Sequence, residues 1–123
     1  MRAKQIVERM LEDRLASFYH AAPGSRVEAI QKSGLEPRRE KRGLGAASDG
    51  RVIYFFRDLA TAEDAVSNWL MDEWPETETE AVVFECRLPD NAVIPDPELS
   101  GSYIYVGSAI PPEQLKIVAT WPL

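Results

Sequence analysis

The sequence predicts a single-domain α+β protein, with helices in the first two-thirds of the chain and antiparallel strands toward its end. Its 123 residues suffice for one domain with its own core. Apolar side chains recur at helical spacing in three segments of the first two-thirds. Six of the nine prolines lie in the last third, where rigid turns favour short strands over long helices.

Residues 3–15 predict a first, amphipathic helix, because apolar side chains recur at helical spacing between charged ones. Residues 17–21 predict a short strand. Because side chains alternate along a strand, Phe18 and His20 are expected on one face and Tyr19 on the other.

A second helix is predicted over residues 25–34. Ser25 and Glu28 form an S-x-x-E pattern, the capping box in which each side chain binds a free backbone N–H. Gly34 stands where a residue of left-handed conformation ends a helix. The basic, glycine-rich residues 37–50 then predict a loop, with room for a short edge strand inside it.

One strand and a third helix are predicted in the middle of the chain. Residues 51–57 enclose the apolar run VIYFF, which predicts the strand. The third helix is expected to begin at Thr61 and to stop before Pro75, because proline disfavours helix in the residue before it. The run PETETE that follows predicts an acidic connector.

Residues 81–88, 102–106 and 115–121 predict three further strands, the last two joined through a turn at Pro111 and Pro112. Residues 81–88 alternate with a period of two and place Cys86 on the face of Phe84 and Leu88. Cys86 is therefore predicted to be a core residue rather than a nucleophile.

Composition excludes several chemistries. One histidine and one cysteine can form neither an intramolecular disulfide nor a His/Cys zinc site of four ligands. Neither a nucleotide-triphosphate phosphate loop nor a G-x-S-x-G turn occurs, and the run GLGAAS follows a basic segment instead of the strand that a dinucleotide fingerprint needs. Because no apolar run is long enough for a membrane span or a secretion signal, we expect a cytoplasmic protein with no membrane partner.

Charge is divided unevenly along the chain, whose net charge is −6. Residues 1–57 carry 12 basic and 7 acidic side chains, whereas residues 58–123 carry 2 basic and 13 acidic ones. Two interpretations stay open, namely two faces of one domain, or a basic first half that holds an anion.

Three segments follow one another as SFYHAAPGSRVEAIQKSGLEP, GRVIYFFRDLATAEDA and SGSYIYVGSAIPPEQL. The first holds an aromatic-His-small strand before a short helix that ends in Gly-Leu, and the second a G-x-x-Y-F strand before a helix rich in alanine. In order and spacing the three resemble the catalytic domains of ADP-ribosyltransferases of the poly(ADP-ribose) polymerase and diphtheria-toxin type. The resemblance runs from about residue 18 to residue 115 and implies a single domain with a split, mainly antiparallel sheet.

The resemblance implies that NAD is the substrate and that no metal takes part. It assigns the contact to the adenosine ribose to His20, the grip on the nicotinamide amide to the backbone of Ala21, and stacking on the nicotinamide ring to Tyr54. An imidazole offers a donor and an acceptor to a ribose diol, and an aromatic face stacks on a planar cation.

Two further contacts follow from the resemblance. Thr61 stands at the Ser/Thr position before the helix of the second segment. The basic residues that begin at Arg38 are placed to contact the diphosphate, or else form a solvated loop. They are Arg38, Arg39, Lys41 and Arg42.

The third segment departs from the family pattern, because Ser102 stands where the family has its catalytic glutamate. That carboxylate stabilises the positive charge that develops on the ribose as nicotinamide leaves, and a serine keeps the hydrogen bond without the charge. Chain elongation is therefore not expected, and a single unit would be transferred. Glu98 and Glu113 are the acidic residues nearby that could substitute.

The sequence thus predicts a small mono-ADP-ribosyltransferase-like protein that modifies a protein or nucleic-acid acceptor. One alternative keeps the fold without turnover, as a binding module for NAD, ADP-ribose or a modified nucleic-acid end. A second is a protein-interaction domain whose acidic second half binds a basic partner. A tRNA 2′-phosphotransferase is a weaker interpretation, because it needs an appended basic domain for which 123 residues leave no room.

Overall fold

A computed structural model describes residues 15–39, 51–99 and 101–123 of the chain. Six strands form one sheet in the order β4-β5-β2-β1-β3-β6, and every neighbouring pair is antiparallel. The strands are β1 Leu15–Pro23, β2 Ile53–Phe56, β3 Glu80–Pro89, β4 Val93–Pro95, β5 Ser102–Tyr105 and β6 Leu115–Pro122. The α-helices of the described residues are α2, Val27–Ser33, and α4, Leu59–Asn68. The predicted α+β class with an antiparallel sheet is confirmed.

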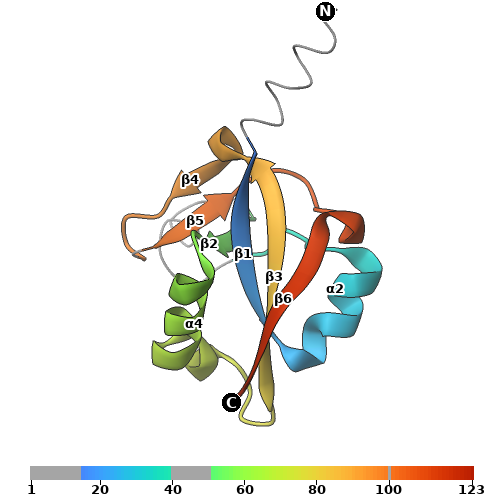
Figure 1. Cartoon of the computed structure of the whole chain (residues 1–123), viewed down its shortest axis with the longest axis vertical. Helices are drawn as coiled ribbons and strands as arrows, with labels where there is room; N and C mark the ends of the chain where they lie inside the picture. The colour runs from blue at the N-terminus through green and yellow to red at the C-terminus, as the bar shows by residue number, and fades with distance from the viewer. Residues whose placement is uncertain (1–14, 40–50, 100) are drawn as a thin grey trace, which may run out of the picture.

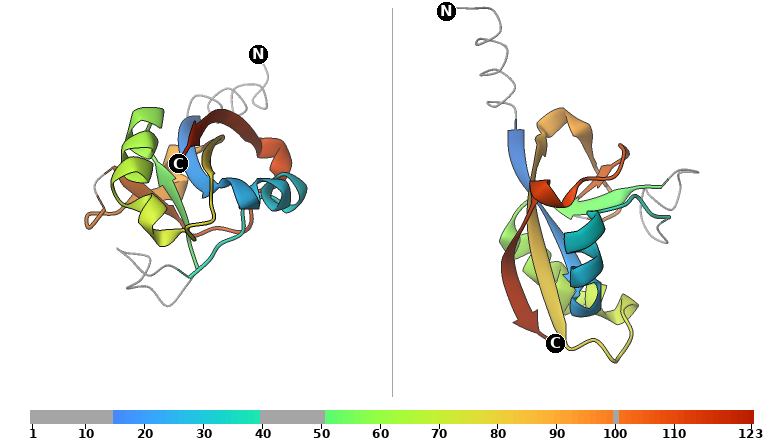
Figure 2. Two further views of the ribbon diagram at one scale, coloured as in Figure 1. Left: turned by 90° about the horizontal axis from the view of Figure 1, so that it is seen from below. Right: turned by 90° about the vertical axis from the view of Figure 1, so that its right-hand side faces the viewer.

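Strand β1 is paired very unequally with its two neighbours. With β3 it shares nine residue pairs, from Leu15–Pro89 to Pro23–Ala81, whereas with β2 it shares the single pair Tyr19–Phe56. Strand β2 instead pairs along its whole length with β5. As a result β2 runs across the long strands β1 and β3 rather than beside them (Figure 2, right). The six strands therefore form two differently directed parts that meet at Tyr19.

Helices α2 and α4 lie on opposite sides of the long strands (Figure 1). On the α2 side, the core holds apolar residues of β1, β2 and β3 together with Ile30 of the helix. On the α4 side, Ala62 and Ala65 pack on Phe56 and Val83. The alternation predicted for β1 is confirmed, since Phe18 belongs to the first core and Tyr19 packs against the second.

The predicted starts of the second and third helices were wrong. Helix α4 begins two residues before Thr61, because the Asp58 carboxylate accepts the Thr61 backbone N–H at 2.7 Å and caps the helix. Ser25 forms no capping box. It lies in a 3₁₀ turn before α2, and both its hydroxyl and its backbone N–H donate to the carboxylate of Glu78 in the acidic connector.

Three helices were predicted, and the described residues hold two. The predicted helix at residues 3–15 lies outside the described residues except for Leu15, which begins β1. Helix α4 ends at Asn68 rather than near Pro75, because Trp69 leaves helical geometry to pack against Phe56 and a 3₁₀ turn follows. The predicted loop at residues 37–50 lies mostly outside the described residues, and its first part touches the sheet through the isolated bridge Arg38–Val52.

The late strands agree with prediction except for one addition. Strands β3, β5 and β6 lie where alternation placed them, and a short turn at Pro112 precedes β6. Strand β4 was not predicted, since it is three residues long and ends at Pro95.

Gly34 has the expected positive φ, 81°, and a Cβ there would lie 2.0 Å from the Ile110 carbonyl oxygen. No helix among the described residues has the length and apolar character to cross a bilayer.

Phe55 is the side chain on which the two parts of the sheet depend most. It is fully buried on β2 and contacts Phe18 of β1 and Tyr105 of β5 with edge-on rings. We expect Phe55→Ala to lower the free energy of unfolding by about 3 to 5 kcal/mol, measured by urea denaturation. Ile117→Ala on the exposed edge strand should cost less than about 1 kcal/mol. Equal losses in the two variants would contradict this role of Phe55.

Candidate functional site

The imidazole of His20 lies at the point where β1 and β2 separate. Its Nδ1 is 2.9 Å from the backbone carbonyl oxygen of Tyr54, and its ring meets Phe55 edge-on at 6.0 Å. A carbonyl oxygen only accepts hydrogen bonds, so Nδ1 carries the proton and donates. In the neutral ring, Nε2 is therefore left as an acceptor.

The surroundings of His20 keep the ring neutral. Burial lowers the pKa of His20 below its usual 6.5, the hydrogen bond to the Tyr54 carbonyl opposes this, and the positive charge of Arg38 lowers the pKa further. At neutral pH the ring is thus a fixed tautomer that carries its lone pair on Nε2. Such a group accepts a hydroxyl hydrogen, as a ribose would offer.

Tyr54 is half-buried and is held by a carboxylate that the sequence analysis missed. The Tyr54 hydroxyl donates to Oδ2 of Asp96 at 2.7 Å, and the Glu98 backbone N–H donates to Oδ1 at 2.9 Å. Asp96 is only 3% exposed, although it follows the edge strand β4. Its one signal in the sequence is its place between Pro95 and Pro97, where a turn-forming aspartate usually faces solvent.

Ser102 is 2% exposed, and its hydroxyl has no hydrogen-bond partner among the described residues. The turn before it is held against α4, because a Cβ on Gly101 would lie 2.5 Å from the Thr61 methyl group. Thr61 is thus placed beside the turn that precedes β5. A buried hydroxyl without a partner is uncommon and marks a place that a polar ligand group or a water can satisfy.

The topology brings the three quoted segments together. His20 lies on β1, Tyr54 on β2 and Ser102 on β5, and these strands are neighbours in the sheet. Their side chains do not all share a face. The His20 side chain lies on the same face of the sheet as Phe18, which is the α2 side. Tyr54 and Ser102 lie on the face of Phe56, which is the α4 side. A ligand that contacts all three side chains must therefore reach both faces of the sheet, near the place where β1 and β2 are no longer paired.

Of the remaining predicted contacts, the structure relates Ala21 and Arg38 to His20. Ala21 follows His20 on β1 and packs half-buried toward the α4 side. Arg38 is exposed, and its charge reaches His20. Of the other proposed diphosphate contacts, Arg39 is exposed, and Lys41 and Arg42 lie outside the described residues.

The side chains of Glu98 and Glu113, the substitutes considered for the missing glutamate, are both exposed. Cys86 is buried as predicted, and burial raises the pKa of its thiol to about 11, which keeps it protonated and unreactive. Among residues 15–39, 51–99 and 101–123, no cluster of three or more His, Cys, Asp or Glu side chains is arranged to hold a metal ion.

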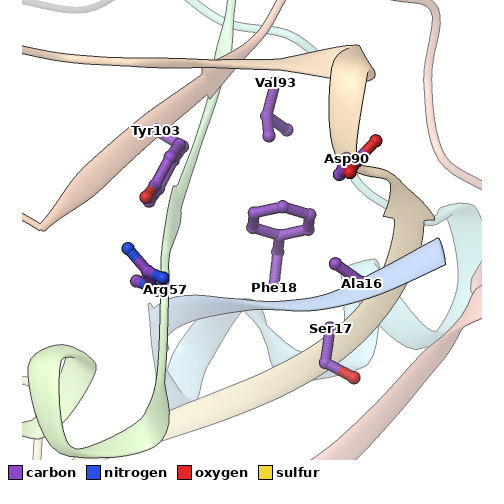
Figure 3. Close-up of a pocket in the computed structure, with 7 residues that line it drawn as sticks. All are labelled: Ala16, Ser17, Phe18, Arg57, Asp90, Val93 and Tyr103. Atoms are coloured by element: carbon purple, nitrogen blue, oxygen red, sulfur yellow. The ribbon is translucent and has the colours of Figure 1, made fainter. Parts of the chain in front are cut away.

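A hollow of about 300 Å³ lies beside β1 and β5 and is lined by seven residues (Figure 3). The ring of Phe18 points into it, with Tyr103 and Arg57 on one side and Asp90 on the other. Its wall contains neighbours of the site residues, since Tyr103 follows Ser102. None of His20, Tyr54 and Ser102 lines it.

Comparison with known proteins does not assign the chain to a family. No protein-family model matches its sequence, and no curated protein matches it significantly. The function therefore rests on the residues and their geometry.

His20 is the single histidine of the chain, which makes its titration readable. Its pKa is lowered in the folded state, so between that value and 6.5 the unfolded chain binds more protons. The free energy of unfolding should thus be constant with respect to His20 above pH 6.5 and fall as the pH drops below it. We expect this slope in wild type and not in His20→Gln, measured by denaturant unfolding from pH 5 to 7.5. An identical slope in both would contradict the assignment.

Ser102→Ala should leave the free energy of unfolding unchanged or raise it. The substitution removes a buried hydroxyl that has no partner in the described part of the chain, so no hydrogen bond is lost. The comparison variant Asp58→Ala removes the cap of α4 and should lower stability by about 1 kcal/mol. A loss of more than about 1 kcal/mol in Ser102→Ala would mean that the hydroxyl has a protein partner.

Proposed function

We propose that the chain binds NAD where β1, β2 and β5 meet and transfers one ADP-ribose unit to a macromolecular acceptor. The observation that carries this proposal is the convergence of the three segments on neighbouring strands. His20 and Tyr54 are 34 residues apart in the chain and meet through a hydrogen bond of 2.9 Å. Nothing in helix or strand periodicity requires segments so far apart to meet at those residues.

The hydrogen-bonding groups suit the parts of NAD that the family resemblance assigns to them. Nε2 of His20 is an acceptor for a ribose hydroxyl, because Nδ1 is committed to the Tyr54 carbonyl. The Tyr54 ring is held in place by its hydroxyl and offers its face to the nicotinamide cation. The exposed Arg38, whose charge reaches His20, is placed to offset the charge of the diphosphate.

The reaction breaks the bond between nicotinamide N1 and the ribose C1′. The bonding electron pair leaves with nicotinamide, which becomes neutral, and positive charge develops on the ribose. An acceptor oxygen or nitrogen then bonds to C1′ and gives up its proton to solvent. The residues of the chain act by orienting NAD and by placing dipoles and charges around the ribose.

A second candidate function is a binding module for NAD or ADP-ribose without turnover. Ser102 favours it, because a serine at the place of the family glutamate offers a hydroxyl and no charge. The two candidates share the site and differ in whether nicotinamide is released.

NAD binding should quench or shift the fluorescence of the chain, which has tryptophans at positions 69, 74 and 121. Nicotinamide release is followed with NAD labelled in the nicotinamide ring, with the protein alone and with cell lysate. Binding with release supports the transferase, and binding without release under any condition supports the module. Neither binding nor release would overturn both.

Tyr54→Ala should weaken NAD binding by about fivefold or more, since a ring stacked on a cation contributes about 1 kcal/mol. The matched control is Tyr105→Ala, a half-buried strand tyrosine that packs on Phe55 on the opposite face. Titrations of folded protein, checked by circular dichroism, should give an altered Kd for the first variant only. Equal weakening in both would place the ligand elsewhere.

A further inference from the structure

We propose that Asp96 supplies the negative charge that Ser102 lacks, and that it acts on the ribose through the hydroxyl of Tyr54. This inference rests on the proposed function and names the residue that would make turnover possible without a glutamate on β5. Asp96 is a positioning residue here, because its carboxylate contacts Tyr54 rather than NAD.

The backbone register places Asp96 beside the position of the missing glutamate. Strand β4 pairs Ile94 with Ile104 and Pro95 with Tyr103. The Asp96 backbone N–H continues this ladder by donating to the Ser102 carbonyl at 2.9 Å. Because directly opposed residues of antiparallel strands share a face, the side chain of Asp96 lies on the side of Ser102. The carboxylate of Asp96 thus lies one strand away from the position of the family glutamate, at the end of β4 instead of on β5.

Hydrogen bonds donated to both of its oxygens favour the ionised form of the Asp96 carboxylate. Both of its oxygens accept, Oδ2 from the Tyr54 hydroxyl at 2.7 Å and Oδ1 from the Glu98 backbone N–H at 2.9 Å. With 3% exposure, water screens the charge weakly. Burying a charge costs free energy. An aspartate that only ended an edge strand could remain exposed and avoid this cost.

The Tyr54 hydroxyl transmits this charge toward the ribose. A phenol that donates to a carboxylate carries more negative charge on its oxygen than a free phenol. That oxygen, with the adjacent carboxylate, favours the positive charge that develops at C1′ as the bond to nicotinamide breaks. The effect concerns the transition state, because bound NAD has not yet lost its nicotinamide.

Asp96→Asn tests the charge with little change of shape. An asparagine still accepts from the Glu98 N–H and can still bond to the Tyr54 hydroxyl. We expect nicotinamide release from NAD, with water as acceptor, to slow by roughly 100-fold, while the Kd for NAD changes by less than about threefold. A substitution that only loosened the fold would weaken binding and lower Tm as well.

Three carboxylates serve as comparisons. Asp72→Asn makes the same charge change at an exposed position of the turn after α4 and should leave release unchanged. Glu98→Gln and Glu113→Gln test the alternative substitutes. If either slows release as much as Asp96→Asn does, or if Asp96→Asn releases nicotinamide at the wild-type rate, the inference is overturned.

A double-mutant cycle tests the route through Tyr54, and its first variant leaves Asp96 unchanged. Tyr54→Phe keeps the ring and removes the hydroxyl that contacts Asp96. It should slow release at least tenfold with an unchanged Kd, and adding Asp96→Asn should slow it little more. Wild-type release in Tyr54→Phe, or effects that multiply in the double variant, would overturn the inference.

The proposed function and this inference fail in different ways. If the wild type neither binds NAD nor releases nicotinamide, the proposed function fails and the inference with it. If the wild type binds NAD but releases nothing with or without lysate, the binding module stands and the inference is overturned. If the wild type releases nicotinamide and Asp96→Asn does too, the function stands and the inference alone is overturned.

Discussion

The structure depends on how unequally β1 is bonded to its two neighbours. Its ladder with β3 spans nine residue pairs, and its ladder with β2 is one pair long. Beyond that pair, the His20 imidazole of β1 donates to the Tyr54 carbonyl of β2. Buried backbone groups need partners. The His20 side chain therefore helps to join the two parts of the sheet, and the same contact fixes the tautomer in which Nε2 is an acceptor.

The rest of the site is held by packing around this point. Phe55 fills the α2 side beneath His20, and α4 presses Thr61 against the turn before Ser102. Asp96 links the loop after β4 to Tyr54 on β2, so the hydroxyl of Tyr54 is oriented by a different part of the chain. His20 and Tyr54 thus each lie on a strand, and each side chain is fixed by a contact to another part of the chain, as positioning a reacting bond requires.

Local periodicity was enough to predict the class, most strands and the faces of Phe18, Tyr19 and Cys86, because alternation is a property of neighbouring residues. The contact of Ser25 could not be predicted, since its partner is Glu78, which is remote in sequence. Asp96 was missed for the same reason. Its burial depends on Tyr54 and Ser102 meeting it across strands, and an aspartate between prolines otherwise indicates an exposed turn. The binding of NAD stays a prediction.

The strand order also constrains how the chain folds. Of the five neighbouring strand pairs, only β1–β2 and β4–β5 join strands that follow one another in sequence. The residue pair of the β1–β3 ladder that is nearest in sequence is Pro23–Ala81, so β1 has no long partner until the chain has been made as far as β3. Contacts this distant in sequence make folding slow. During synthesis, the apolar face of β1 stays uncovered until β3 has been made. Strand β5, which begins with Ser102, is made later still, so the candidate site can form only after most of the chain has been synthesised.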